Sequence, residues 1–173
     1  VVTDNVGNVY LAGLTEGSTN LATAGAHQSV YNDNNDAFLV KFNPSGNRIW
    51  ATYYGGLDEE LETKVAADNT GNVYITGRTQ STSSIATAGA FLTSYSGDDD
   101  VYLVKFNSLG IRQWGTYYGG LNFEIEPVIA TDLNGNVYLA GQTNSTNLMS
   151  TAGVVQTTLG GSDDGFLAKF NGA

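Results

Sequence analysis

Several residue types are scarce or missing in this chain of 173 residues, and each absence excludes a class of protein. The lack of cysteine excludes disulfides, thiol catalysis and thiolate metal sites. No apolar run approaches the roughly 20 residues of a transmembrane helix, so we expect no membrane insertion. Only seven Lys and Arg accompany 17 Asp and Glu, which gives a net charge of −10. Because such a field repels phosphates, we expect no nucleic-acid partner.

The composition that remains points to a folded, exported protein. Hydrophobic residues make up 41 % of the chain, which is enough for a core, and Asn, Thr, Ser and Gly are abundant. Few cations among many small polar residues are typical of extracellular surfaces, so we expect an extracellular or bacterial cell-surface location. The opening residues show no signal peptide. We therefore expect that a leader was removed or that the chain is an excerpt of a longer protein.

The dominant feature is an internal repeat with a period of 64 residues. The string GNVY begins at Gly7, Gly71 and Gly135, and TYYGG begins at Thr52 and Thr116. The segments DAFLVKFN, DVYLVKFN and DGFLAKFN recur at the same step. No insertion shifts the register, so the chain is built from copies of one structural unit.

Each unit reads as four short strands joined as two hairpins. In the second unit the expected strands are residues 64–68, 72–79, 101–107 and 111–118, rich in β-branched and aromatic residues. The tight NTGN turn contains Gly71, which can supply a positive φ angle, and Asp68 can bond the turn backbone through its side chain. No segment has the apolar period of a helix.

Both faces of the third strand are apolar, which distinguishes two all-β architectures. In VYLVKF, residues Tyr102, Val104 and Phe106 point one way while Val101 and Leu103 point the other. A sheet with one solvated face does not show this pattern, whereas a sheet packed between similar sheets does. We therefore predict β-propeller blades, each a four-stranded antiparallel meander. A β-sandwich of about eleven strands is the alternative, although it does not require a strict period.

The repeated strings carry a family resemblance. The combination D-x-x-G-N-V-Y, then T-A-G-A, then D-x-[FY]-L-[VA]-K-F-N and W-x-T-Y-Y-G-G resembles the bacterial SBBP family of β-propeller repeats, and it covers essentially the whole chain. The resemblance implies a multi-bladed propeller in large secreted or cell-surface bacterial proteins, usually without an assigned reaction.

The period divides the chain, a single propeller segment over 1–173, into units at about 1–56, 57–120 and 121–173, the last without its outermost strand. Closed propellers have about four to eight blades, so nearly three blades form a partial ring. The expected partners are therefore further blades of the same chain or a second copy of it, which together complete the ring. A surface glycan or another protein is the other expected partner.

Acidic residues that recur at the period suggest a metal site. Asp36, Asp100 and Asp164 precede the third strands, while Glu60 with Glu62 and Glu124 with Glu126 precede the first, innermost strands. Carboxylates gathered at the mouth of a channel can hold Ca²⁺, which takes six to eight oxygen ligands. Solvated acids at strand ends are the competing interpretation, because none of these strings has EF-hand spacing.

Catalysis has little support in the sequence. His27 is the only histidine, which argues against a catalytic triad, and no cofactor motif is present. Trp50 and Trp114 can either stack on sugar rings or pack between blades. We expect a non-enzymatic structural, adhesive or protein-interaction module, with Ca²⁺ as a candidate stabiliser. A carbohydrate-binding module is the first alternative, and a fragment of a glycan-processing enzyme using Glu62 and Glu126 is the second.

Overall fold

The structure is a computed structural model that describes residues 1–17, 20–32, 34–147 and 150–172. Its first sheet contains β1 (Val2–Thr3), β2 (Val9–Thr15), β3 (Asp36–Phe42) and β4 (Arg48–Tyr54). The second contains β5 (Glu60–Ala67), β6 (Val73–Thr79), β7 (Asp100–Phe106) and β8 (Arg112–Tyr118). The third contains β9 (Glu124–Thr131), β10 (Val137–Thr143) and β11 (Asp164–Phe170). Over the described ranges no helix occurs, and hence none that could cross a membrane.

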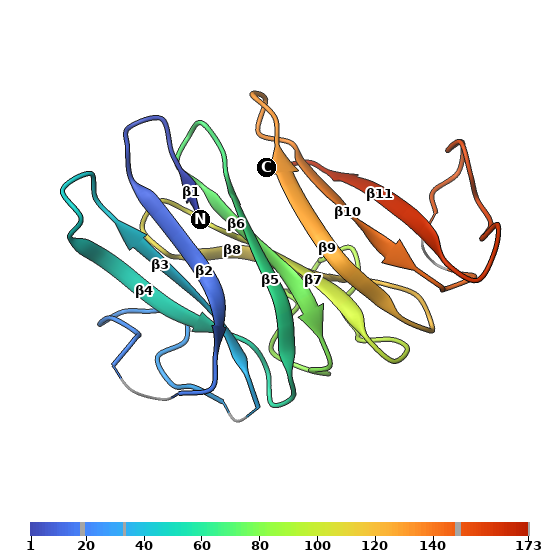
Figure 1. Ribbon diagram of the computed structural model, residues 1–173, viewed down its shortest axis with the longest axis horizontal. Helices are drawn as coiled ribbons and strands as arrows, with labels where there is room; N and C mark the ends of the chain where they lie inside the picture. The colour runs from blue at the N-terminus through green and yellow to red at the C-terminus, as the bar shows by residue number, and fades with distance from the viewer. Residues whose placement is uncertain (18–19, 33, 148–149, 173) are drawn as a thin grey trace.

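The strands of each sheet follow one another in sequence, and all the pairings within the sheets are antiparallel. The three sheets lie next to one another in chain order, as Figure 1 shows. Within the described ranges no strand is exchanged between the sheets. This arrangement confirms the predicted all-β propeller-blade fold and excludes the β-sandwich.

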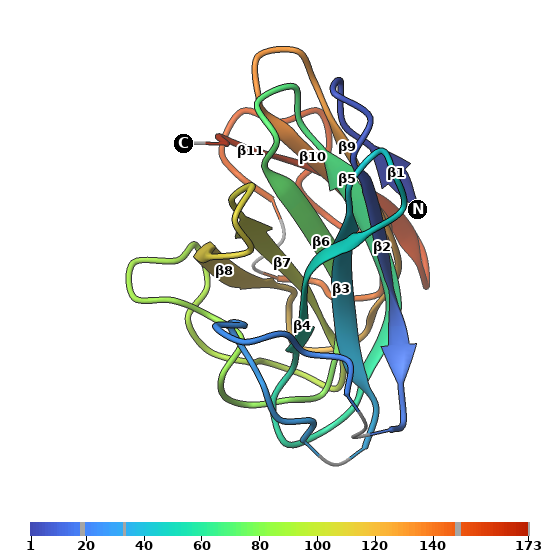
Figure 2. The same ribbon diagram turned by 90° about the vertical axis from the view of Figure 1, so that its left-hand side faces the viewer.

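The hairpins between first and second strands are closed by the predicted turn chemistry. The Asp68 Oδ1 atom accepts hydrogen bonds from the backbone N–H of Thr70 and Asn72, both at 2.9 Å. Gly71 has a φ of 83°, which a side chain would strain. In the other two units, Asp4 Oδ1 and Asp132 Oδ1 accept the corresponding hydrogen bonds from the backbone N–H groups of Asn8 and Asn136. In Figures 1 and 2 these turns lie at the top, while the connections that follow β2 and β6 lie at the bottom.

The innermost strands start earlier than the sequence suggested. Glu60 and Glu62 lie inside β5 rather than before it, since Glu60 pairs with Thr79 and Leu61 with Arg78. A β-bulge follows at Glu62, which has a φ of 56°. The sequence did not reveal that β5 begins at Glu60, because a bulge breaks the period-two alternation by which a strand is recognised.

The apolar core lies between the sheets rather than within any one of them. Tyr10, Leu39 and Tyr54 of the first sheet pack with Tyr102 and Phe106 of the second in one cluster. Two smaller clusters join the second sheet to the third. We call the side of each sheet that carries Leu39, Leu103 or Leu167 its forward face. Each forward face except the third is covered by the next sheet, which is why the two faces of β7 are both buried.

Candidate functional site

The predicted acidic residues meet in pairs at the junctions between sheets. Asp36 begins β3 and Glu60 begins β5, and both side chains are fully buried. Asp36 Oδ1 and Glu60 Oε2 each lie closer than 3.0 Å to the point that a Cβ on Gly55 would occupy. The two oxygens therefore converge over a residue that has to be glycine. This close approach explains the first glycine of TYYGG.

Hydrogen bonds satisfy most of the carboxyl oxygens of Asp36 and Glu60. Asp36 Oδ2 accepts from Gln28 Nε2 at 2.7 Å and from the Asn32 N–H at 2.9 Å. Glu60 Oε1 accepts from the Thr79 hydroxyl at 2.7 Å. Asp36 Oδ1 has no protein donor and is buried. Burial raises the pKa of Asp36 to about 6, and burial together with the nearby Asp36 charge raises that of Glu60 to about 7.

The second junction repeats this geometry one period later. Asp100 Oδ1 and Glu124 Oε2 converge over Gly119 in the same way, and both residues are fully buried. Glu124 accepts from the Gly120 N–H at 2.8 Å and from the Thr143 hydroxyl at 2.5 Å. Burial raises the pKa of Asp100 to about 7 and raises that of Glu124 as well. These four buried acids are part of the packing between sheets.

Asp164 occupies the same position in the third sheet, where no glutamate among the described residues lies across from it. Its Oδ2 atom accepts from Gln156 Nε2 at 2.7 Å and from the Gly160 N–H at 2.6 Å, as Asp36 accepts from Gln28 and Asn32. The Asp164 side chain is only partly buried. Each unit thus supplies the hydrogen-bond donors to its own aspartate. The glutamate that is paired with Asp36 or Asp100 comes from the following sheet.

Glu62 and Glu126 form a different contact along the inner strands. The backbone N–H of Glu126 donates to Glu62 Oε2 at 2.8 Å, and Glu126 is exposed. The structure therefore divides the seven predicted metal ligands into separate contacts. Over the described residues no group of three or more His, Cys, Asp or Glu side chains gathers as a metal cluster would. Calcium binding at these residues stays a prediction.

The two tryptophans lie where sheets meet. Trp50 in β4 is buried, its indole N–H donates to the Ser108 carbonyl at 3.1 Å, and its ring lies 6.2 Å from that of Tyr10. Trp114 in β8 is partly buried between Tyr74 and Phe170. Both rings contribute to packing between sheets. The carbohydrate-binding alternative, which needs an exposed tryptophan to stack on a sugar ring, is therefore not supported by either residue.

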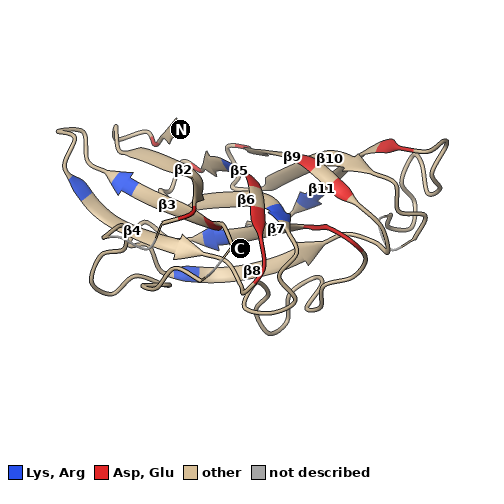
Figure 3. Ribbon diagram, turned by 60° about the horizontal axis from the view of Figure 1, so that its bottom comes forward, with Lys and Arg blue, Asp and Glu red and all other residues tan. Residues whose placement is uncertain are grey.

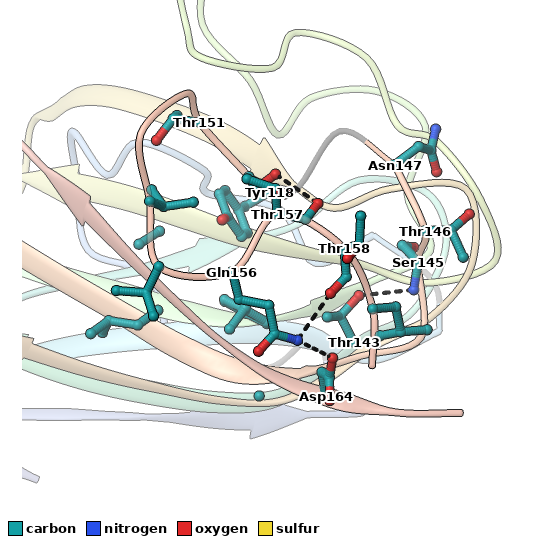
Figure 4. Close-up of a pocket in the computed structure, with 18 of the residues that line it drawn as sticks. Tyr118, Thr143, Ser145, Thr146, Asn147, Thr151, Gln156, Thr157, Thr158 and Asp164 are labelled. Atoms are coloured by element: carbon teal, nitrogen blue, oxygen red, sulfur yellow. Dashed lines mark hydrogen bonds between the residues drawn. The ribbon is translucent and has the colours of Figure 1, made fainter. Parts of the chain in front are cut away.

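A hollow of about 710 Å³ lies at the third sheet, a feature that the sequence analysis did not anticipate. It is lined by β11 and by the connection that follows β10, and Figure 4 shows Gln156 bonded to Asp164 within it. A comparison of the three units could have revealed this hollow. The first two continue into a fourth strand, whereas among the described residues the third ends with β11.

Comparisons with known proteins agree with this architecture. The chain is 26 % identical to an uncharacterized WD repeat-containing protein of Acanthamoeba polyphaga mimivirus, a match covering 61 % of this chain and 9 % of that protein. It is 29 % identical to the regulatory protein FlaEY of Caulobacter vibrioides, over 64 % of this chain and 12 % of that protein. The chain thus spans about a tenth of the length of these relatives.

The family comparison identifies the repeat itself. Residues 49–83 and 113–148 match the β-propeller repeat family SBBP. Each match begins in the outermost strand of one sheet, β4 or β8, and runs through the first two strands of the next. Each matched segment therefore includes the Gly-Gly sequence of a junction and its glutamate, Glu60 or Glu124, but not the paired aspartate. Two segments of this chain, which together make up less than half of it, thus match the β-propeller repeat of the SBBP family.

Proposed function

We propose that the chain is a non-catalytic structural and protein-interaction module of an extracellular or cell-surface protein. The observation that carries the proposal is a set of acidic residues in the long connections, which follow the second strand of each sheet or join one sheet to the next. This set, the acidic rim, is exposed and comprises Glu16, Asp58, Asp98 and Asp163. In Figure 3 acidic residues also mark β5 and β9. Loops held by a rigid scaffold are where proteins commonly bind partners.

The few basic residues do not neutralise the acidic rim. Lys41 and Lys105 are buried and donate to the backbone carbonyls of Ser108 and Gly172. Arg78 lies near Asp99, with 3.8 Å between its Nε and Asp99 Oδ1. The rim therefore keeps its negative field, which favours a protein partner with a basic surface. The names of the two relatives, a WD repeat-containing protein and a regulatory protein, agree with such a role.

A lysine-rich peptide is a suitable probe of this proposal. We expect calorimetry to detect binding at about 20 mM salt and its loss at about 500 mM, because salt screens exposed charges. Replacing Asp98 and Asp163 by Asn should weaken the binding. The matched control, Glu62→Gln with Glu126→Gln, changes the net charge equally but on the inner strands. Equal weakening by the two double variants, or no binding at low salt, contradicts the proposal.

We also retain calcium as a proposed stabiliser. Of the seven predicted ligands, Glu62, Glu126 and Asp164 remain partly or fully exposed and can take part in coordination. Thermal unfolding in millimolar CaCl₂ and in EDTA tests the idea, since a ligand that binds only the folded state raises Tm. Identical values of Tm in the two buffers would contradict the proposal that calcium binds and stabilises the folded chain.

A further inference from the structure

Two exposed leucines recur at the period in the loops that join one sheet to the next. Leu57 and Leu121, which we call the rim leucines, each follow the Gly-Gly sequence of a junction. Their exposed fractions are 70 % and 60 %. The two residues after each leucine differ between the loops, DE in one and NF in the other, whereas the leucine is the same. A single exposed leucine is ordinary, but burial does not explain why both loops carry one.

The exposure of the rim leucines is a property of the junctions themselves. Leu57 lies between β4 and β5, and Leu121 lies between β8 and β9. In the described part of the chain, each of these junctions has a sheet on both sides. Both leucines therefore remain exposed although the neighbouring sheets are in place.

Buried serines hold the two loops in place. The Ser81 hydroxyl donates to the Asp58 carbonyl at 3.0 Å and accepts from the Asp58 N–H at 3.1 Å. One period later, the Ser145 hydroxyl accepts from the Asn122 N–H at 3.0 Å. A Cβ added at Gly56 would lie 2.4 Å from the Ser81 Cβ, so the loop packs directly on the serine. A loop held in this way presents its leucine at a low cost in conformational entropy when a partner binds.

Each rim leucine also lies beside one acid of the acidic rim. Asp58 follows Leu57 directly and is exposed. Asp98, likewise exposed, lies against the loop of Leu121, because its N–H donates to the Asn122 carbonyl at 3.4 Å. The surface at each junction is therefore apolar and negative at once. Such a surface is complementary to apolar side chains that are flanked by cations.

The two leucines lie at the beginnings of neighbouring strands. Leu57 lies three residues before β5, and Leu121 lies three residues before β9. These strands are adjacent, since the Glu126 N–H donates to Glu62 Oε2 at 2.8 Å. One partner segment can therefore contact both leucines.

We propose that the rim leucines, together with Asp58 and Asp98, bind a polypeptide segment in which leucine-sized apolar side chains are flanked by Lys or Arg. The inference rests on the proposed function, because it specifies the partner of the acidic rim. Burial of the leucines supplies affinity that salt does not screen, and the carboxylates select a basic partner. A second copy of this chain fits less well, since its net charge of −10 repels the rim.

Two peptides with the same number of lysines test the proposal on the whole chain. One has leucines between the lysines, and the other has serines in their place. We expect calorimetry to show that the leucine peptide binds at least about tenfold more tightly, because it buries apolar surface against the rim leucines. It should also keep part of its affinity at about 500 mM salt, at which the serine peptide no longer binds.

A pair of double variants assigns this difference to the rim leucines. Leu57→Ser with Leu121→Ser should reduce the affinity for the leucine peptide to that for the serine peptide. The matched control is Leu109→Ser with Leu133→Ser, which removes two leucines that are 71 % and 84 % exposed in short turns at the other end of the strands. The control should bind the leucine peptide as the parent chain does. All four leucines are exposed, so we expect equal Tm values in both variants and the parent chain.

The possible results separate this inference from the proposed function. Equal affinity for the two peptides, or equal losses in the two double variants, overturns the role of the rim leucines and leaves the acidic rim as a basic-peptide site. Binding of the leucine peptide alone at about 20 mM salt contradicts the acidic rim as the source of attraction. A dimer in sedimentation that Leu57→Ser with Leu121→Ser dissociates would show that a second copy covers the leucines, and would overturn the proposal.

Discussion

The third strands of the second and third sheets differ little in sequence and greatly in environment. β7 reads DVYLVKF and is buried at every position, whereas β11 reads DGFLAKF and alternates between partly buried and exposed. Leu103 is 0 % exposed and the matching Leu167 is 73 % exposed. Burial of these strands is thus set by the neighbouring sheet and not by the strand's own residues.

The same difference extends to the charged residues of the two strands. Asp100 meets Glu124 of the next sheet, while Asp164 keeps only its local cradle. Lys105 bonds the Gly172 carbonyl of the next sheet. Each unit therefore supplies one half of each contact, and the following sheet provides the other half. Such nearest-neighbour stabilisation is the behaviour expected of repeat proteins.

The largest expected effect contrasts the two leucines directly. We expect Leu103→Ala to lower the free energy of unfolding by about 2–5 kcal/mol, because it leaves a cavity between two sheets. Leu167→Ala, the matched control, should change it by less than about 0.5 kcal/mol. Urea unfolding of both variants measures the difference. Similar losses in the two variants would mean that the forward face of the third sheet is covered in solution.

A smaller effect is expected at the glycines of the junction. In Gly119→Ala the new methyl group would collide with the Asp100 and Glu124 carboxyl groups, and we expect a loss of about 1–3 kcal/mol. A Cβ added at Gly161, in the last connection, would have no other atom within 4 Å. Gly161→Ala should therefore be neutral within about 0.5 kcal/mol. Thermal unfolding distinguishes the two, and a neutral Gly119→Ala would show that the carboxyl groups do not converge there.

The smallest expected effect is a dependence of stability on pH. The pKa values of Glu60 and Asp100 are raised by burial to about 7, so the folded state binds more protons than the unfolded state above pH 4. The free energy of unfolding should therefore fall as pH rises from about 4 to about 7, by roughly 1–2 kcal/mol, and then level off.

Two variants relate this pH dependence to the junction. Asp100→Asn should reduce the slope because the amide cannot ionise and can donate a hydrogen bond to Glu124. Leu167→Ala, made on the uncovered sheet, should retain the slope of the parent chain. Guanidinium titrations at several pH values provide the measurement. Equal slopes in Asp100→Asn and the parent chain would count against the paired arrangement.

At the acid end, the turn aspartates act in the opposite direction. Although burial opposes it, hydrogen bonds from Asn72 and Thr70 hold the pKa of Asp68 below its usual range. Bonds from the Asn136 side chain and backbone lower that of Asp132 to about 2. Groups of this kind contribute stability above pH 4 that is lost as pH falls through the folded pKa. The two sets of aspartates share one period. At Asp36 and Asp100 burial outweighs the hydrogen bonds, whereas at Asp68 and Asp132 the hydrogen bonds outweigh burial.

Much of the fold followed from the sequence because the period is strict. The repeat of GNVY fixed the hairpins, and the two apolar faces of VYLVKF required a sheet on either side. The Asp68 and Gly71 turn was likewise readable, since its chemistry is local. These features depend on residues that lie close together in the chain.

The site was less accessible to sequence reasoning because its contacts join different units. The acids were recognised as a repeating set, but the pairing of Asp36 with Glu60 depends on how one sheet meets the next. The bulge at Glu62 placed Glu60 inside a strand, where it is buried.

Hydrogen exchange in β6 and β10 tests most directly the claim that each sheet is stabilised by the next. Both strands are flanked by a strand on each side, so their backbone hydrogen bonds are equivalent. At low protein concentration we expect the amides of 137–143 to exchange at least about tenfold faster than those of 73–79, because the third sheet can open without the others. Equal protection of the two strands would contradict the account.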